Sequence, residues 1–168
     1  IIPGGTIDLN LDDKFFCYHS KIAIKKKLRV LSFSIKNDLS FTKLIKIKKK
    51  AQNKYELFIK IEKQIYSFYS KNENQNNIYN ILASLTALYS LIDIKKLKKN
   101  IFFNFKTPIG RGDISSLKIK GKNIHLVDES YNSNPLSVRI ALDNFNKMNV
   151  KKTNKKNLIL GDMLELGN

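Results

Sequence analysis

The sequence has few of the residues that build disulfide frameworks and metal clusters. It contains one cysteine, Cys17, and two histidines, His19 and His125, among 168 residues. One cysteine forms no internal disulfide, and two histidines need carboxylate help to hold a metal ion. No apolar run approaches the roughly 20 residues that a membrane-spanning helix requires. The composition therefore excludes disulfide-rich, cysteine-based metal and membrane-inserted classes, and we expect no metal site.

Arginine is also scarce, although the chain is strongly basic. Lys and Arg together number 31 against 14 acidic residues, a net charge of +17, yet only Arg29, Arg111 and Arg139 are arginines. A charge of this size indicates a polyanionic partner or compositional drift. Proteins that read phosphates and bases favour the bidentate fork of arginine over lysine. We therefore favour drift and expect no nucleic-acid partner, with a basic nucleic-acid-binding module kept as the alternative.

Enough apolar residues are present for a packed core. Hydrophobic residues make up 42% of the chain and aromatic residues 10%, which excludes wholesale disorder. The first residues, Ile1-Ile2-Pro3, contain neither an initiator methionine nor a signal-peptide pattern. The last residues follow an apolar run directly. Both ends therefore predict a piece of a longer protein.

The first two thirds of the chain predict a mixed α/β domain. A strand over 6–9, a helix over 14–24 capped by Asp12 or Asp13, and a strand over 28–34 come first. Three β-like runs with short polar separators then predict an antiparallel meander, over 41–48, 55–61 and 64–69. Apolar spacing predicts a helix over 78–91, and Asp93 can cap a second helix over 94–103. Pro108 and Gly110 mark the predicted domain boundary.

The last third predicts a strand, a tight turn and a strand over 115–127. Asn134 fits the N-cap and Pro135 the first position of a following helix with Val138, Ala141, Leu142 and Phe145 on its inner face. A short apolar run over 157–160 predicts another strand. Strand, helix and strand in this order indicate a βαβ unit. The fold class is therefore α/β, with two adjoining partial domains over 1–107 and 108–168.

Three segments could carry ligand chemistry. The densest is the polar cluster 128–134, at the end of a strand and the start of a helix, where open α/β sheets bind ligands and helices favour anions. A capped turn explains that cluster equally well. Arg111 between two glycines could contact a phosphate or simply be solvated. Asn77 and Asn80, at i and i+3, could read an adenine edge or cap a helix.

Nucleophilic chemistry, by contrast, has no assembled residue set. His19 and His125 have no evident Ser or Cys partner in the sequence, and we expect Cys17 to lie in the core. No phosphate-binding GxxxxGK[ST] loop is present. We therefore assign no catalytic residue within the chain.

Five segments, in order, resemble motifs of the Mur ligases. Residues 127–135 (VDESYNSNP) resemble the D-D-S-Y-N-A-N-P motif, and 160–167 (LGDMLELG) resemble L-G-D-M-L-E-L-G. Gly110-Arg111 falls where the family has G-R, before its C-terminal domain. Residues 77–83 (NIYNILA) are similar to its H-N-x-x-N-A-L-A segment, and 9–13 (LNLDD) to its N-x-D-D. The form of the two C-terminal motifs is that of the branch that adds D-alanyl-D-alanine to UDP-N-acetylmuramoyl-tripeptide.

The resemblance implies an ATP-dependent amide-bond ligase of peptidoglycan synthesis, on which cell shape and cell division depend. Such an enzyme activates a carboxylate of the UDP-muramoyl-peptide as an acyl phosphate, which the amine of D-alanyl-D-alanine attacks. The resemblance further implies ATP and Mg²⁺ as cofactors, a cytoplasmic location and a monomeric full-length protein. This chain would hold the end of the central ATPase domain and the start of the C-terminal domain. The phosphate-binding loop and most Mg²⁺ ligands would lie upstream, so the fragment alone would be inactive.

The resemblance also implies roles for individual residues. Asn77 and Asn80 would face the adenine, and Arg111 would contact the ribose or phosphates of ATP across the domain junction. Asp128 or Glu129 would hold the ribose. Tyr131, Asn132 and Asn134 would shape the substrate cleft. Three residues depart from the family pattern: Glu129 replaces an Asp, Asn76 a His and Asn74 a Gly.

A sister amide ligase is the nearest alternative, either another Mur ligase or a folylpolyglutamate synthase. The segment 131–135 (YNSNP) argues against it, because those sisters carry His-containing versions of this turn.

Overall fold

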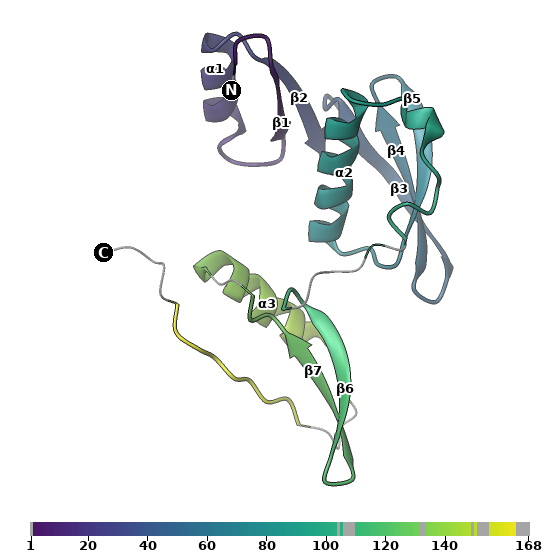
Figure 1. Ribbon diagram of the computed structural model, residues 1–168, viewed down its shortest axis with the longest axis vertical. Coiled ribbons are helices and arrows are strands. Elements are labelled where there is room, and N and C mark those ends of the chain that lie inside the picture. Colours follow the sequence, from purple (N-terminus) through teal and green to yellow (C-terminus); the bar gives the residue numbers. More distant parts are fainter. Residues whose placement is uncertain are drawn as a thin grey trace. The chain divides into compact units, whose positions relative to one another are not determined.

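A computed structural model describes residues 2–103, 105, 110–131, 134–148, 150 and 155–163 of the chain. It contains two compact units, Ile1–Phe105 and Lys106–Asn168, which we call unit 1 and unit 2 (Figure 1). The predicted marker Pro108 lies outside the described residues. The assignment of 1–107 and 108–168 to two Mur ligase domains remains a prediction.

Unit 1 begins with a parallel strand–helix–strand arrangement. Strand β1 (Thr6–Asn10) pairs with β2 (Arg29–Ser34) in parallel, from Thr6 opposite Arg29 to Asn10 opposite Phe33. Helix α1 (Phe16–Lys25) makes the crossover that parallel strands require. The two predicted strands and the helix between them are confirmed.

The same sheet continues as an antiparallel meander. The first two residues of β3 (Thr42–Ala51) pair in parallel with the end of β2. Strands β3, β4 (Lys54–Ile61) and β5 (Gln64–Ser70) then pair antiparallel, giving the sheet order β1-β2-β3-β4-β5. The meander predicted from alternating residues is confirmed.

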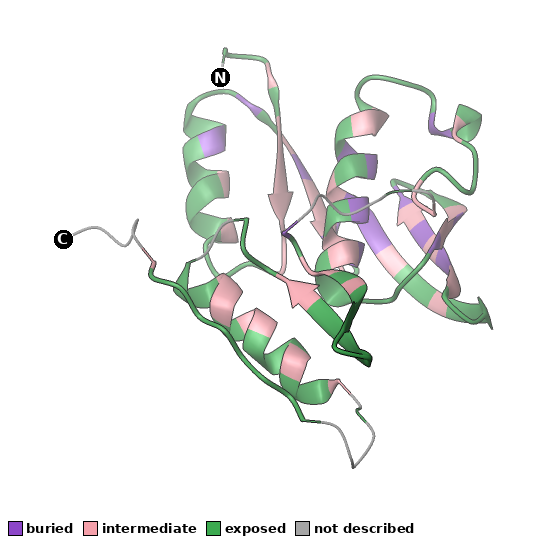
Figure 2. Cartoon of the chain, turned by 60° about the horizontal axis from the view of Figure 1, so that its bottom comes forward, coloured by how far each residue is buried: buried purple, intermediate pink, exposed green. Residues whose placement is uncertain are grey.

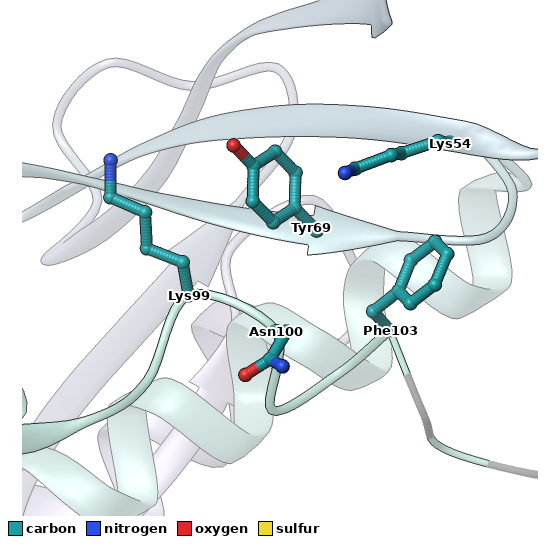
Figure 3. Close-up of a pocket in the computed structure, with 5 residues that line it drawn as sticks. All are labelled: Lys54, Tyr69, Lys99, Asn100 and Phe103. Carbon is teal, nitrogen blue, oxygen red and sulfur yellow. The ribbon is translucent and has the colours of Figure 1, made fainter. Parts of the chain in front are cut away.

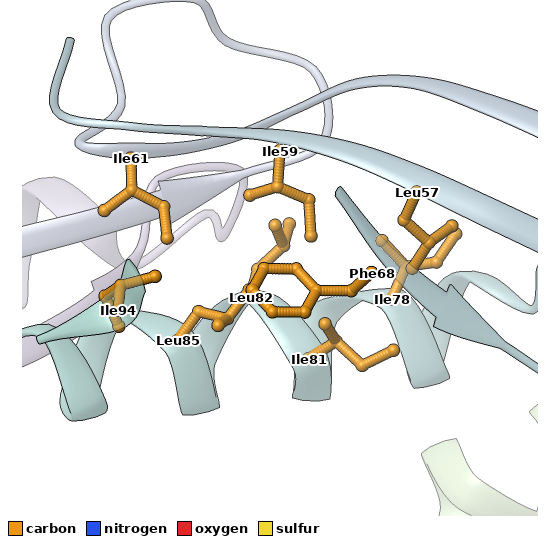
Figure 4. Close-up of a cluster of buried hydrophobic side chains, with 9 residues drawn as sticks. All are labelled: Leu57, Ile59, Ile61, Phe68, Ile78, Ile81, Leu82, Leu85 and Ile94. Atoms are coloured by element: carbon orange, nitrogen blue, oxygen red, sulfur yellow. The ribbon is translucent and has the colours of Figure 1, made fainter. Parts of the chain in front are cut away.

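The core of unit 1 lies between the meander and helix α2 (Gln75–Tyr89). Alternate residues of β4 and β5 face the helix, and apolar residues of the helix at i, i+3, i+4 and i+7 spacing pack against them. Each such buried side chain contributes roughly 1.5–3 kcal/mol. The cluster comprises Leu57, Ile59, Ile61, Phe68, Ile78, Ile81, Leu82, Leu85 and Ile94 (Figure 4).

The helix predicted over 94–103 is wrong beyond its first turn. Asp93 caps it as expected, accepting from the backbone N–H of Lys95 at 3.0 Å, but only the short 3₁₀ turn η1 (Ile94–Lys96) forms. Leu97 is extended, and the carbonyl of Lys99 accepts from the backbone N–H of Tyr69 at 2.7 Å. Bonding to the exposed edge of β5 therefore replaces helical bonding, a choice that local spacing does not reveal.

Two predictions about α1 are also wrong. Neither Asp12 nor Asp13 is its N-cap, which is Phe15, with no side-chain cap bond. Asp12 does not cap the helix because its carboxylate accepts a hydrogen bond from the Ser34 hydroxyl, at the end of β2, at 2.7 Å. Cys17 is exposed rather than in the core, because α1 contacts the sheet through a narrow stripe in which only Ala23 is fully buried.

Unit 2 begins with a β-hairpin and continues into a helix. Strands β6 (Asp113–Ile119) and β7 (Lys122–Asp128) pair antiparallel around a turn in which Lys120 and Gly121 both have positive φ. Hairpins favour such turns because their twist matches that of the strands. Helix α3 (Pro135–Lys147) starts as predicted, with Asn134 as N-cap and proline in its first turn.

The strand predicted over 157–160 does not form. These residues are exposed and irregular, and among the described residues β6 and β7 form a two-stranded sheet. A four-residue run has strand propensity but gains little unless a partner strand is positioned beside it. The βαβ unit predicted here is therefore incomplete in the described residues. No residue of α3 is buried, as its pink and green colouring shows (Figure 2).

Among the described residues, no helix has both the length and the apolar character needed to cross a membrane.

Candidate functional site

Residues 110–112, which we call the glycine turn, precede β6 and are hydrogen-bonded to the end of β7. The backbone N–H of Gly112 donates to the carbonyl of Asp128 at 2.7 Å, and the N–H of Tyr131 donates to the carbonyl of Gly110 at 3.1 Å. The N–H of Gly110 donates to the carboxylate of Asp113 at 2.6 Å. The first two bonds bring the predicted Gly-Arg segment against the predicted polar cluster, and the third closes the glycine turn on itself.

Only glycine fits this turn. Gly110 and Gly112 both have φ of +79°, a conformation that is costly for residues with a side chain. A Cβ at Gly110 would lie 2.9 Å from the backbone nitrogen of Tyr131. A Cβ at Gly112 would lie 2.9 Å from a carboxylate oxygen of Glu129. The glycines therefore allow two predicted site residues to approach the loop closely.

The turn presents Arg111 on the face of Tyr131. The guanidinium carbon lies 4.4 Å from the ring centroid, well within cation–π range. Both residues are exposed, and among the described residues Arg111 forms no ion pair. The ring restrains the arginine while its N–H donors remain available to an anion.

Three carboxylates surround the turn: those of Asp113, Asp128 and Glu129. Asp113 and Asp128 are cross-strand partners. Hydrogen bonds from Ser130 lower the pKa of Asp128. Desolvation of the carboxyl over Gly112, followed by the negative charges of Asp113 and Asp128, raises the pKa of Glu129. Asp128 is therefore a firm hydrogen-bond acceptor at neutral pH.

Sequence reasoning missed Asp113 because it predicted the hairpin turn at 121–123, a register that does not pair Asp113 with Asp128. The turn lies instead at Lys120 and Gly121, which places Asp113 opposite Asp128. Its carboxylate organises the glycine turn rather than facing solvent alone.

The side chain of Asn134 is used by the helix. Its Oδ1 accepts from the backbone N–H of Ser137 at 2.9 Å, and the Ser137 hydroxyl accepts from the N–H of Asn134 at 2.9 Å. This reciprocal capping box fixes the first turn of α3. Asn134 is therefore a structural cap, whatever contact its exposed edge makes. Asn132 lies outside the described residues, as do residues 164–168 of the second C-terminal motif.

The other predicted contacts, Asn77 and Asn80, lie on the first turns of α2 in unit 1. Asn77 is half-buried, and its amide donates to the hydroxyl of Ser70 at 3.0 Å. That bond fixes the amide at the junction of β5 and α2. Asn80 is exposed. Neither residue is the N-cap, which is Asn74.

Among the described residues of unit 1, the carboxylate of Asp12 accepts the most hydrogen bonds. It accepts from the Ser34 hydroxyl at 2.7 Å, the backbone N–H of Ile35 at 2.7 Å and the Tyr79 hydroxyl at 2.9 Å. It lies at the carboxyl ends of parallel β1 and β2, the edge at which open sheets bind ligands. Here its carboxylate oxygens accept hydrogen bonds from the protein itself, and these bonds link the end of β1 to β2 and α2.

The donor set near Arg111 suits a nucleotide better than a metal. A cation with free N–H groups matches phosphate oxygens, and a carboxylate such as Asp128 matches ribose hydroxyls. In the part of the chain that the structure describes, no three His, Cys, Asp or Glu side chains are grouped so as to hold a metal ion.

No protein-family model matches the chain, and no curated protein matches it either. Solved structures do. A crystal structure of MurF from Acinetobacter baumannii matches with a TM-score of 0.66 and 17% identity, covering 89% of this chain and 31% of that chain. The chain has a Mur ligase fold.

Two further Mur ligases match over similar lengths. MurF ligase from Thermotoga maritima, solved in complex with ADP, has a TM-score of 0.58 and 18% identity over 88% of this chain. A UDP-N-acetylmuramoyl-L-alanyl-D-glutamate–2,6-diaminopimelate ligase has a TM-score of 0.60 and 14% identity over 85% of it. The chain spans 28–32% of the length of these three proteins. The expected α/β class with partial Mur-ligase-like domains is confirmed.

Proposed function

We propose that the chain is part of an ATP-dependent ligase that joins D-alanyl-D-alanine to UDP-N-acetylmuramoyl-tripeptide in peptidoglycan synthesis. The observation that carries the proposal is the agreement of two independent sources. The fold is similar to MurF structures over 89% of the chain, and the motifs fall in the family's order along it.

The geometry of unit 2 supports a nucleotide role for the proposed residues. Arg111, held on Tyr131 with free donors, supplies a positive charge for a ribose or phosphate oxygen. Asp128, with its lowered pKa, is ionised at neutral pH and accepts from ribose hydroxyls. Glu129, next to Asp128 in the sequence, has one methylene more than the Asp that the family has at this position.

In unit 1 we propose that Asn77 and Asn80 face the adenine. The bond from Asn77 to Ser70 leaves its amide oxygen as an acceptor for an exocyclic amine. Asn80 is exposed and has both an amide donor and an acceptor to offer. Tyr131, Asn132 and Asn134 are proposed to border the substrate cleft, with Asn134 acting mainly through the capped start of α3.

Bound ATP would supply the phosphoryl group that activates the peptide carboxylate, and Mg²⁺ would balance its charge. The residues of this chain would bind and orient the nucleotide. We propose, from the resemblance to the Mur ligases, that most Mg²⁺ ligands and the phosphate-binding loop lie elsewhere in the complete protein. We further propose a cytoplasmic monomer.

The fold alone leaves the sister ligases open, since a diaminopimelate-adding enzyme matches it as well. Residues 131–135 (YNSNP) favour the D-alanyl-D-alanine branch over His-containing relatives. Measuring ADP release by the complete protein with UDP-N-acetylmuramoyl-tripeptide separates the alternatives. We expect turnover with D-alanyl-D-alanine and background rates with diaminopimelate or glutamate.

The isolated 168-residue chain serves as the control in that assay, and we expect it to show no ATP turnover. Turnover by the complete protein with diaminopimelate or glutamate in place of D-alanyl-D-alanine would contradict the proposed substrate. Turnover by the 168-residue chain itself would contradict the proposal that the phosphate-binding loop lies outside it.

A further inference from the structure

An open pocket of about 440 Å³ lies where residues 99–103 meet β4 and β5. The backbone bond from Tyr69 to Lys99 holds that segment in place. Its lining residues come from β4, β5 and this segment: Lys54, Tyr69, Lys99, Asn100 and Phe103 (Figure 3). Cavities of about 300–1,000 Å³ are typical of small-molecule sites.

Aromatic rings of this pocket restrain two lysines: Lys54, which lines it, and Lys71, which lies outside its lining. The ammonium of Lys54 lies 4.5 Å from the ring centroid of Tyr69 and 5.9 Å from that of Phe103. The ammonium of Lys71 lies 5.7 Å from the Phe103 centroid. Figure 3 shows the Lys54 side chain extended toward the Tyr69 ring. Such contacts restrain flexible side chains, which lowers the entropy lost when they bind a ligand.

Among the described residues, neither lysine that lines the pocket forms an ion pair, although the positive charge of Lys99 contributes to the lowered pKa of Glu56. Glu56 is the cross-strand partner of Tyr69, but it pairs with Lys50 at 3.0 Å. Among the described residues, the ion pairs within 4 Å are this one and Lys43–Asp38. The ammonium groups of Lys54 and Lys99 can therefore bind an external anion.

The residues that line this pocket lie outside the hydrophobic core of unit 1. Leu57 and Phe68, the neighbours of Glu56 and Tyr69 along their strands, point to the opposite face and form the core. Phe102 closes that core by an edge contact with Phe68 at 5.5 Å. Phe103 and Tyr69 remain half-exposed as walls of the pocket.

We propose that this pocket binds a small organic phosphate, with the phosphate on Lys54 and Lys99 and the organic part against Tyr69 and Phe103. The amide of Asn100 offers a further donor. The proposal uses none of the residues assigned to ATP above and does not depend on the proposed function.

Phenyl phosphate is a suitable probe because it joins a phosphomonoester to an aromatic ring. Titration into the isotope-labelled 168-residue chain, followed by NMR, should shift the amide signals of residues 54, 69 and 99–103. Inorganic phosphate should bind at least tenfold more weakly, and phenol should leave the signals unchanged. We expect Lys54→Met and Lys99→Met each to weaken phenyl phosphate binding roughly tenfold.

The matched control is Lys63→Met, which removes the same charge from the exposed turn between β4 and β5 and should bind like the parent. Lys99 lies in an exposed segment, so its variant tests the site even if the strand variant unfolds. Equal weakening in Lys63→Met, or no shift at residues 99–103, would overturn the proposal. So would tighter binding of single-stranded oligonucleotides with affinity rising with length, because that result would indicate a polyanion surface instead.

Discussion

Replacing Asp12 by alanine is expected to lower the free energy of unfolding of unit 1 by about 3 kcal/mol. The carboxylate accepts from Ser34, Ile35 and Tyr79 at 2.7–2.9 Å. Hydrogen bonds to a charged group contribute roughly 1.5–3 kcal/mol, and their loss leaves the donors unpaired. Urea titration followed by the circular dichroism of the chain measures the change.

The same carboxylate predicts acid sensitivity. Burial raises the pKa of Asp12, but hydrogen bonds from Ser34, Ile35, Tyr79 and Lys36 outweigh it and leave the pKa below its ordinary value. A carboxyl with a lowered pKa stabilises the folded state above its unfolded pKa of about 4. That contribution is lost as the pH falls through the folded pKa. The difference between wild type and Asp12→Ala should therefore shrink at pH below about 4.

Asp13 provides the matched control, because its exposed carboxylate accepts from the adjacent backbone N–H of Phe15 alone among the described residues. We expect Asp13→Ala to change stability by less than about 1 kcal/mol. Equal destabilisation by the two alanine variants would show that Asp12 is not the hub of unit 1.

In the complete protein, Arg111→Ala should raise the KM for ATP about 10- to 100-fold and leave the KM for D-alanyl-D-alanine nearly unchanged. Arg111 is the exposed cation of the glycine turn, restrained by Tyr131. A charge-assisted bond to a nucleotide oxygen contributes roughly 1.5–3 kcal/mol, and 1.4 kcal/mol is a tenfold change in affinity. Steady-state kinetics with each substrate varied in turn measures the two constants.

Arg139→Ala is the control for that experiment. Arg139 is an exposed arginine on α3, away from the glycine turn in sequence, and its loss should change neither constant. An equal rise of both KM values in Arg111→Ala would contradict a nucleotide role for the residue.

Much of unit 1 follows from the sequence because its patterns are strong and local. Alternation in β3 to β5 and the 3.6-residue period of α2 reflect burial of one face, which the side chains themselves dictate. The conformation of residues 97–103 was predicted wrongly because their apolar spacing is compatible with a helix. Pairing with the edge of β5, through the Tyr69–Lys99 bond, decided their conformation. Such pairing depends on tertiary position.

The candidate site was predictable in part. The start of α3 could be predicted because the side chain of Asn134 and the ring of Pro135 favour the first positions of a helix whatever surrounds them. The stacking of Arg111 on Tyr131 could not be, because twenty residues separate them and only the hairpin brings them together. The sequence identified Asp12 as a notable residue, but its predicted role as a helix N-cap was wrong. Its partners Ser34 and Tyr79 lie 22 and 67 residues away.

Asn77 and Asn80 are proposed to contact the adenine of a bound nucleotide. Photolabelling of the complete protein with 8-azido-ATP, followed by peptide mapping, tests this contact. We expect labelling of the peptide that contains Asn77 and Asn80, with protection by unlabelled ATP. Protected labelling confined to peptides outside residues 1–168 would contradict it.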